Sequence, residues 1–159
     1  MVGGNKKTYE IIRPLFNIMG KKSILCGDIG TGQSAKICNN MLLATTMIGV
    51  GESFKLAEKL KLDSNKLFEV LSTSTGSCWA INTYSPFKNV GPESPADNDY
   101  KGGFASSLMY KDLGLAMNAI NKSKLELDHV KNTYEKYENL VRSGKGNLDF
   151  SIIVNNLNK

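Results

Sequence analysis

The sequence predicts a mainly α-helical protein, a helical bundle around one long central helix, preceded by a short helix and a strand. Two observations predict this class. Residues 33–61 keep apolar side chains at helical spacing without a proline, and most of the chain after them repeats that spacing. Residues 23–26 give the strand signal. A chain of 159 residues is long enough to bury one sizeable core.

The first part of the chain is expected to contain a helix, a strand and a turn. Residues 5–19 carry apolar side chains close to helical spacing, and Pro14 inside this pattern predicts a kink or a break near Arg13. Residues 23–26 (SILC) form the strand. The glycine-rich turn at 27–32 fits neither a Walker phosphate loop nor the fingerprint G-x-G-x-x-G. Its glycines are instead expected to allow a sharp turn and a close approach to another backbone.

The predicted central helix, residues 33–61, would be roughly 40 Å long. Its middle is apolar on most sides, which predicts burial at the centre of the domain, and its end is amphipathic. Gly49 and Gly51 lie in this middle part. A glycine inside a helix is unfavourable on its own, so both glycines predict that a neighbouring helix packs closely there.

Shorter helices are expected to follow the central helix. Asp63 or Ser64 caps the first of them, and Pro86 ends the second. Proline, aspartate and asparagine then mark a loop. The expected segments are a helix beginning at residue 63 or 64 and ending before the polar break at 72–76, a helix at 77–84, the loop at 89–102, and helices at about 105–121, 127–141 and 148–157.

Composition excludes several classes of function. The net charge of +5 is modest, and acidic residues lie between the lysines, whereas nucleic-acid-binding proteins concentrate positive charge on one face. No apolar run reaches the roughly 18 residues of a membrane span. Cys26, Cys38 and Cys78 are widely spaced and His129 is the only histidine, so no metal site is predicted. Cys26 and Cys38 are expected to be small core residues, which fits a reducing compartment.

One stretch, residues 30–40 (GTGQSAKICNN), leads from the glycine turn into the long helix. Lys36 and Asn40 lie four residues apart, so they share one face of this helix about one turn apart. Small and apolar neighbours predict that at least the stem of Lys36 is buried. Burial disfavours the ammonium form, which would let the amine exchange a proton near neutral pH. The alternative is a lysine whose amine simply reaches water.

The same stretch resembles the β-hydroxyacid dehydrogenase family, in which G-x-G-x-x-x-K-x-x-N-N opens the helix that joins two domains. Three later segments in the same order, GSCWAINTYSP, YKGGF and LMYKDLGLA, are similar to 3-hydroxyisobutyrate dehydrogenases in particular, and the similarity covers nearly the whole chain. The resemblance implies that residues 1–30 are a helix–strand remnant of a Rossmann domain. It implies that residues 31–159 form an all-helical domain for substrate binding and oligomerisation.

The resemblance also implies a reaction, the oxidation of a short 3-hydroxy acid to its semialdehyde with NAD as cofactor. Lys36 matches the lysine that takes the alcohol proton, and Asn40 matches the amide that orients the substrate. Lys111 matches a second lysine, which reaches the cofactor near its nicotinamide end. Phe104 matches a residue that faces the substrate pocket, although core packing explains it equally well. Trp79 lies in a similar wall-forming segment and is expected to be part of the core.

Other interpretations remain open from the residues alone. Lys111 is also explained as a surface lysine beside Asp112. The chain could be a non-catalytic oligomerisation module, with Met47, Ile48, Phe54 and the apolar face of the last helices as its contact surface. The substrate could be another small hydroxy acid, and NADP could replace NAD, because the residue that contacts the ribose lies outside this sequence.

The ends of the sequence lead to a further expectation. Residues 1–4 resemble an internal strand end and not a signal or transit peptide. The chain is therefore expected to be the C-terminal half of a longer enzyme and inactive alone, because the nucleotide fingerprint and the substrate-carboxylate loop precede it in the family. The resemblance implies a mitochondrial homo-oligomer that binds a small hydroxy acid, and neither a membrane nor a nucleic acid.

Overall fold

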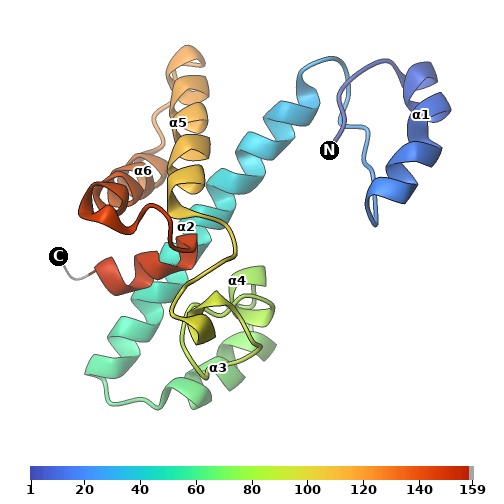
Figure 1. Ribbon diagram of the computed structural model, residues 1–159. Coiled ribbons are helices and arrows are strands. Elements are labelled where there is room, and N and C mark those ends of the chain that lie inside the picture. Colours follow the sequence, from blue (N-terminus) through green and yellow to red (C-terminus); the bar gives the residue numbers. More distant parts are fainter. Residues whose placement is uncertain (158–159) are drawn as a thin grey trace. The chain divides into compact units, whose positions relative to one another are not determined.

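The computed structural model describes residues 1–157 and divides into two compact units, Met1–Asn40 and Met41–Lys159. The structure is mainly helical, as predicted (Figure 1). Helix α2 (Thr31–Lys59) begins in the first unit and continues into the second. The division into domains after residue 30 stays a prediction, because α2 is one continuous helix that contributes to both units.

Helix α1 (Lys6–Met19) belongs to the first unit. It begins after Asn5, whose side-chain oxygen accepts hydrogen bonds from two backbone N–H groups of the first turn at 2.8 and 3.3 Å. The helix continues past Pro14, so the predicted break does not occur. The buried residue of α1 is Tyr9, whose hydroxyl lies 2.7 Å from Ser23 Oγ and so joins the helix to the segment that follows it.

Residues 23–26 do not form the predicted strand. They make an isolated parallel bridge between Val2 and Leu25, flanked by hydrogen bonds from Val2 N–H to Ile24 O (2.8 Å) and from Cys26 N–H to Val2 O (2.7 Å). A pair of segments without further strands is too small to be a stable sheet. Residues 1–157 therefore contain no sheet. The sequence predicts a helix–strand remnant of a Rossmann domain, whereas this part of the structure has a helix and one isolated bridge.

The glycine turn before α2 brings two backbones close together, as predicted. A Cβ atom at Gly32 would lie 2.8 Å from the backbone nitrogen of Gly3, so only glycine fits there. Gly30 has a φ of +95°, a conformation that other residues rarely adopt. Thr31 then begins α2, with its N–H and its hydroxyl bonded to Asp28 O at 3.1 and 2.7 Å. This turn fixes where the helix that carries Lys36 begins.

In the second unit, the later helices lie near their predicted positions. The final segment differs, because it is a 3₁₀ helix, and the predicted loop contains a 3₁₀ turn. The elements are α3 (Ser64–Thr73), α4 (Trp79–Asn82), η1 (Pro95–Asn98), α5 (Ser106–Lys122), α6 (Asp128–Leu140), the π-helical turn η2 (Val141–Lys145) and η3 (Phe150–Asn156).

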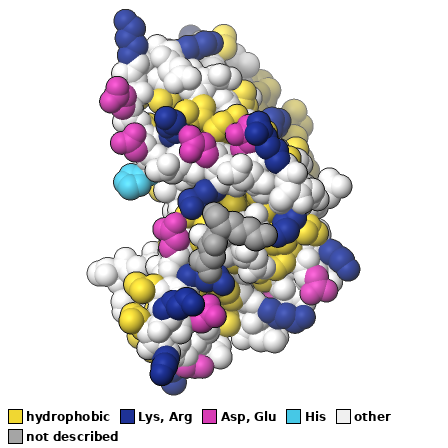
Figure 2. Space-filling model, turned by 90° about the vertical axis from the view of Figure 1, so that its left-hand side faces the viewer, with side chains coloured by type: hydrophobic (Ala, Val, Ile, Leu, Met, Phe, Trp, Pro, Cys, Tyr) yellow, Lys and Arg dark blue, Asp and Glu magenta, His cyan; other side chains and the backbone are white. Residues whose placement is uncertain are grey.

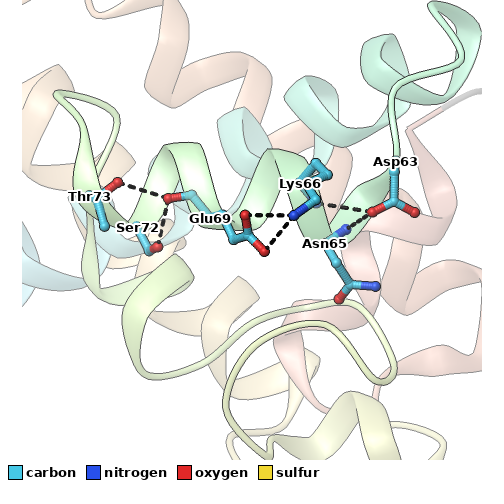
Figure 3. A network of polar contacts seen from close by, with 6 residues as sticks. All are labelled: Asp63, Asn65, Lys66, Glu69, Ser72 and Thr73. Atoms are coloured by element: carbon cyan, nitrogen blue, oxygen red, sulfur yellow. Dashed lines mark hydrogen bonds and ion pairs between the residues drawn. The ribbon is translucent and has the colours of Figure 1, made fainter.

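Helix α3 is organised by its own polar side chains (Figure 3). Asp63 caps it, because its Oδ1 accepts the N–H groups of Asn65 and Lys66 at 3.0 Å each. Lys66 pairs with Glu69 one turn later, with Nζ–Oε2 at 3.0 Å. Of the two residues predicted as the cap, Asp63 is therefore the cap, and Ser64 is the first helical residue.

Helices α5 and α6 lie side by side in the second unit, and η3 packs against both (Figure 1). Their apolar faces and that of α2 form one core. The largest fully buried apolar side chains of this core are Met47, Ile81, Met109, Leu113, Tyr137, Leu140, Phe150, Ile153 and Val154. The core holds the segments before α5 and before η3 against each other, which is where the candidate pocket residues lie.

The two glycines of α2 differ in their surroundings. A Cβ at Gly51 would lie 2.6 Å from Leu157 Cδ1 and 2.7 Å from Val154 Cγ1, so η3 packs directly on the helix backbone. A Cβ at Gly49 would meet nothing within 4 Å, and Gly49 is exposed. The prediction of close packing is therefore right for Gly51 and wrong for Gly49.

Membrane-spanning helices, charged stripes and metal sites would each mark a function among the described residues. None of the described helices is long and apolar enough to cross a bilayer. On the face shown in Figure 2, basic and acidic side chains are interspersed and do not form a stripe of one sign. Among residues 1–157 no three His, Cys, Asp or Glu side chains are placed to share a metal ion. Cys26 is partly buried and Cys38 is exposed, so the expectation that Cys38 is a core residue is wrong.

Candidate active site

Lys36 and Asn40 both lie on α2, one turn apart, as predicted from their spacing. Lys36 is exposed, which corrects the expectation that its stem is buried in this chain. Asn40 is half-buried, and its Oδ1 accepts a hydrogen bond from Asn39 Nδ2 at 3.1 Å. The apolar neighbours that suggested burial belong to other faces of the helix. The amine and the amide are thus presented on a helix surface.

Lys111 lies in the first turns of α5, in the second unit. Its side chain is 60% exposed, and its Nζ lies 3.2 Å from Oδ1 of Asp112, whose side chain is only 5% exposed. A lysine paired on one side and open on the other can still bind a second polar group. Both explanations from the sequence, a cofactor contact and a surface ion pair, are compatible with this placement.

Phe104 lies just before α5, next to a buried carboxylate. Asp149, which is fully buried, accepts the backbone N–H of Phe104 on Oδ2 at 2.7 Å and the hydroxyl of Tyr84 on the same oxygen at 2.8 Å. Its other oxygen accepts the N–H and the hydroxyl of Ser151 at 2.9 and 2.6 Å. Gly103, with φ +67°, has no room for a Cβ beside Asp149. The turn that presents Phe104 is thus held by side chains distant in sequence.

Aromatic rings continue from this turn to the surface. Phe104 meets Phe150 edge to face at 6.0 Å, Phe150 stacks with Tyr84 at 5.7 Å, and Tyr84 stacks with Trp79 at 4.7 Å. Trp79 is 48% exposed, so the expectation that it belongs to the core is wrong. A short helix, α4, places the indole at the outer end of this row because only the neighbouring Ala80 and Ile81 point inward.

The carboxylate also affects nearby hydroxyls. Burial, together with the hydrogen bond to Asp149, raises the pKa of Tyr84 far above its usual value. Burial is also the main reason that the pKa of Tyr137 is raised, with the charge of Asp149 adding to it. Both phenols therefore remain protonated donors at any pH at which the protein functions.

The four predicted site residues fall into two groups. Lys36 and Asn40 belong to the first compact unit, and Phe104 and Lys111 to the second. The structure adds Asp149, which the sequence analysis missed. A signal was available, because an aspartate that precedes an apolar helical segment is a candidate cap. That signal gives no hint of its bonds to residues 84 and 104.

The comparisons with known proteins identify the family. A family model described as the NAD-binding domain of NADP-dependent 3-hydroxyisobutyrate dehydrogenase matches residues 30–157. The mitochondrial 3-hydroxyisobutyrate dehydrogenase of Drosophila melanogaster is 43% identical over 159 residues, which is 100% of this chain and 49% of the relative. The human mitochondrial enzyme is 40% identical over 96% of this chain and 46% of its own length. The chain belongs to the 3-hydroxyisobutyrate dehydrogenase family and corresponds to its C-terminal helical domain.

Solved structures agree with this assignment. The Mycobacterium tuberculosis 3-hydroxyisobutyrate dehydrogenase with L-serine superposes with a TM-score of 0.94 at 42% identity, over 100% of this chain and 54% of that one. A Salmonella typhimurium 3-hydroxyisobutyrate dehydrogenase shares the fold, with a TM-score of 0.81 at 18% identity over 96% of this chain and 52% of its own. The chain spans about half the length of the relatives it matches.

Proposed function

We propose that this chain is the catalytic-helix half of an NAD-dependent dehydrogenase that oxidises 3-hydroxyisobutyrate to its semialdehyde in valine catabolism. The observation that supports it most is the pair Lys36 and Asn40, which α2 presents on successive turns of its surface in a chain of this family. The finer assignments below, of substrate, cofactor and residue roles, are part of this proposal.

The proposed chemistry assigns one task to each residue. Lys111 would hold NAD near its nicotinamide end, and the cofactor would supply the acceptor for the hydride of the alcohol carbon. The Lys36 amine takes the proton that the alcohol oxygen releases, and general base help of this kind contributes on the order of a hundred- to ten-thousand-fold. The Asn40 amide both donates and accepts hydrogen bonds, so it can hold the oxygen of alcohol and of aldehyde alike. Phe104 forms part of the pocket wall.

The residues of this chain fit only part of the cofactor. Lys111, whose side chain is 60% exposed, would hold it near the nicotinamide. The fingerprint for the pyrophosphate is absent from this sequence. Helix α1 also exposes four large apolar side chains, Ile11, Leu15, Ile18 and Met19. A nucleotide-binding half packed on α1 would cover them.

Cofactor choice and cellular location remain parts of the proposal. The matching family model is named for NADP-dependent enzymes, whereas we expect NAD from the sequence resemblance. Several relatives are mitochondrial, and others are bacterial. We expect a mitochondrial enzyme that assembles with copies of itself.

A chimera tests the proposed activity. Residues 1–159 replace the matching half of the Mycobacterium tuberculosis relative, which shares 42% identity over the whole chain. We expect the chimera to reduce NAD in the presence of 3-hydroxyisobutyrate, and the chain alone to be inactive. An inactive but folded chimera would contradict the proposal, as would turnover by the chain alone.

Substitutions at Lys36 test its role in the chimera. Lys36→Ala should lower kcat at least about a hundredfold, because the proton acceptor is lost, with little change in melting temperature. Lys36→Arg keeps the charge but not a usable base, so it should be equally slow. Lys59→Ala, at an exposed lysine near the end of α2, is the control and should retain activity.

A second candidate is a non-catalytic oligomerisation module. Met47, Ile48 and Phe54, the residues expected on its contact face, are buried in the core of this chain and are not available for contacts with other chains. Exposed leucines on α2, Leu42 and Leu56, still favour some contact surface. Under this alternative, the chimera would assemble without turnover, and Lys36→Ala would leave its assembly unchanged.

A further inference from the structure

The buried carboxylate of Asp149 holds two segments that are far apart in the sequence. One oxygen accepts from Tyr84, which follows α4, and from Phe104, which precedes α5, at 2.8 and 2.7 Å. The other oxygen accepts twice from Ser151 in the first turn of η3. All four hydrogen bonds are accepted by a side chain with no exposed surface. We call Asp149 together with the three residues that donate these bonds, Tyr84, Phe104 and Ser151, the Asp149 clamp.

The backbone around the clamp reinforces it. Asp149 N–H donates to Tyr100 O at 2.8 Å, and Phe150 N–H donates to Phe104 O at 2.8 Å. Gly103 adopts φ +67° beside the carboxylate, where a Cβ would collide with it. The turn at 102–104 is therefore held by the Asp149 side chain together with these two backbone hydrogen bonds.

The clamp also fixes the row of rings. Because the hydroxyl of Tyr84 is held by Asp149, its ring is held between Phe150 at 5.7 Å and Trp79 at 4.7 Å. Trp79 is the outermost ring and is half exposed. One carboxylate thus sets both the turn that carries Phe104 and the ring that supports Trp79.

We propose that Asp149 is a positioning residue of the pocket, which fixes Phe104 and the Trp79–Tyr84 stack as a preformed wall through its buried hydrogen bonds. One part of this inference, that the wall faces the substrate, rests on the proposed function. The order that Asp149 imposes on the wall follows from the contacts alone. A carboxylate suits this position because it offers only acceptors, and all four bonds require an acceptor.

Replacement of Asp149 by asparagine retains the shape of the side chain but leaves only one of its two acceptor atoms. In Asp149→Asn one oxygen becomes an NH₂ group, so it faces two donors whichever way the amide turns. A hydroxyl can reorient to accept, but a backbone N–H cannot, so Phe104 or Ser151 loses its acceptor. Tyr84→Phe is a milder change, because it removes one donor and leaves the ring.

The first test uses the 159-residue chain, in which Trp79 is the single tryptophan. Asp149→Asn should speed hydrogen exchange of the Phe104 amide at least about tenfold and make Trp79 more accessible to acrylamide. Tyr84→Phe should affect Trp79 and leave the Phe104 amide protected. Tyr137→Phe is the control, because it deletes a buried hydrogen bond to Phe150 O (3.1 Å) outside the clamp. Unchanged exchange and quenching in Asp149→Asn would overturn the inference.

The second test measures kinetics in the chimera. Asp149→Asn should raise KM for the hydroxy acid at least about fivefold with kcat changed less, and Tyr84→Phe should raise it less. Tyr137→Phe should leave KM unchanged even if its melting temperature falls equally. If all three variants lose only stability, Asp149 has a structural role and the inference fails. If Asp149→Asn does not fold, the comparison of KM between Tyr84→Phe and Tyr137→Phe decides. A higher KM in Tyr84→Phe alone supports the inference, and equal KM values contradict it.

The two proposals can fail separately. An unmutated chimera without activity contradicts the proposed function, and exchange at Phe104 and quenching of Trp79 then decide whether the clamp exists. An active chimera whose clamp variants keep their KM and their exchange rates contradicts the clamp and leaves the proposed function intact.

Discussion

At the level of single residues, the two candidate lysines differ in what holds them. Lys36 is exposed on α2, in the first unit, and Lys111 is paired with Asp112 on α5. The Asp112 side chain is only 5% exposed, so this pair differs from an ion pair between two surface residues, and removing the lysine would take one partner from a buried carboxylate. The ion pair with Asp112 and the proposed contact with the cofactor therefore both remain explanations of Lys111.

Substitution of Lys111 separates these two explanations. Lys111→Met retains the length of the side chain and removes its charge. We expect KM for NAD in the chimera to rise at least about tenfold, because a charge-assisted contact is lost. The melting temperature should also fall, because the Asp112 side chain that pairs with Lys111 is only 5% exposed. The control Lys66→Met breaks a pair with Glu69 that is exposed on both sides and should leave KM unchanged; an equal KM for both variants would show that Lys111 does not contact the cofactor.

Residue-level prediction from sequence succeeded where the position of a residue on a helix depends on spacing. Lys36 and Asn40 four residues apart predict one shared helix face, and α2 provides it. The predictions of burial were wrong for Lys36, Cys38 and Trp79, because the burial of a helical residue depends on which helix face the rest of the chain covers. The bonds of Asp149 to residues 45 and 65 positions earlier depend on tertiary packing, which no local pattern encodes.

At the level of elements, α2 is shaped by two glycines with opposite surroundings. Gly51 lies under Val154 and Leu157, and Gly49 faces open space. A helical glycine costs about 1 kcal/mol relative to alanine through backbone entropy alone. Alanine should therefore be favourable at one position and unfavourable at the other.

This pair gives a matched prediction. Gly49→Ala should stabilise the chain by roughly 0.5–1 kcal/mol, because its Cβ meets nothing. Gly51→Ala should destabilise it by about 1–3 kcal/mol, because Val154 and Leu157 must move away. Denaturant unfolding of both variants measures the difference. Equal shifts for the two would mean that η3 does not pack on α2.

The turn η1 adds an element whose stability depends on pH. Asp97 accepts the N–H of Asn89 at 2.8 Å and that of Ser94 at 2.9 Å, and these bonds hold the pKa of its carboxyl below its usual value. A carboxyl with a lowered pKa stabilises the fold above its unfolded pKa of about 4, and this contribution disappears as pH falls through the folded pKa.

The corresponding experiment compares melting temperatures across pH. Asp97→Asn should melt below the unmodified chain at neutral pH, and the gap should close as pH falls from about 5 to about 2. Asp99→Asn, at an exposed carboxylate 3.8 Å from Lys88, should show a much smaller gap. A gap for Asp97→Asn that is constant with pH would show that its charge does not matter.

Element positions were largely predictable, because helical spacing and caps are local signals. Asp63 and the helices around it lie where the pattern placed them. The strand predicted at 23–26 was wrong because a strand depends on partners, and among residues 1–157 the backbone of this segment forms a bridge with Val2 alone. The predicted helix at 148–157 became a 3₁₀ segment, tied at its start to the turn before α5.

At the level of the whole molecule, the chain consists of two compact units. The second unit contains the buried core, in which Leu113, Phe150 and Tyr137 have no or almost no exposed surface. The first unit buries Tyr9 and little else of apolar character. We therefore expect the second unit to carry most of the stability.

Local exchange rates test this division. Leu113→Ala should cost about 2–5 kcal/mol by leaving a cavity in the core. Amide exchange should then rise across α5 and α6 much more than around Tyr9 in α1. Tyr9→Phe, which removes the contact with Ser23, should show the reverse pattern. A uniform rise in both variants would mean that the two units unfold as one.

The Asp149 clamp has a consequence for the order in which the protein acquires its structure. Tyr84 and Phe104 leave the ribosome well before the carboxylate that organises them, so during synthesis both lack their partner. Until Asp149 emerges, the turn at 102–104 has no acceptor for its amide, and the indole of Trp79 has no fixed ring behind it. Nascent chains halted before residue 149 should therefore contain α3 and α5, but their Trp79 should be more accessible to acrylamide than in the 159-residue chain.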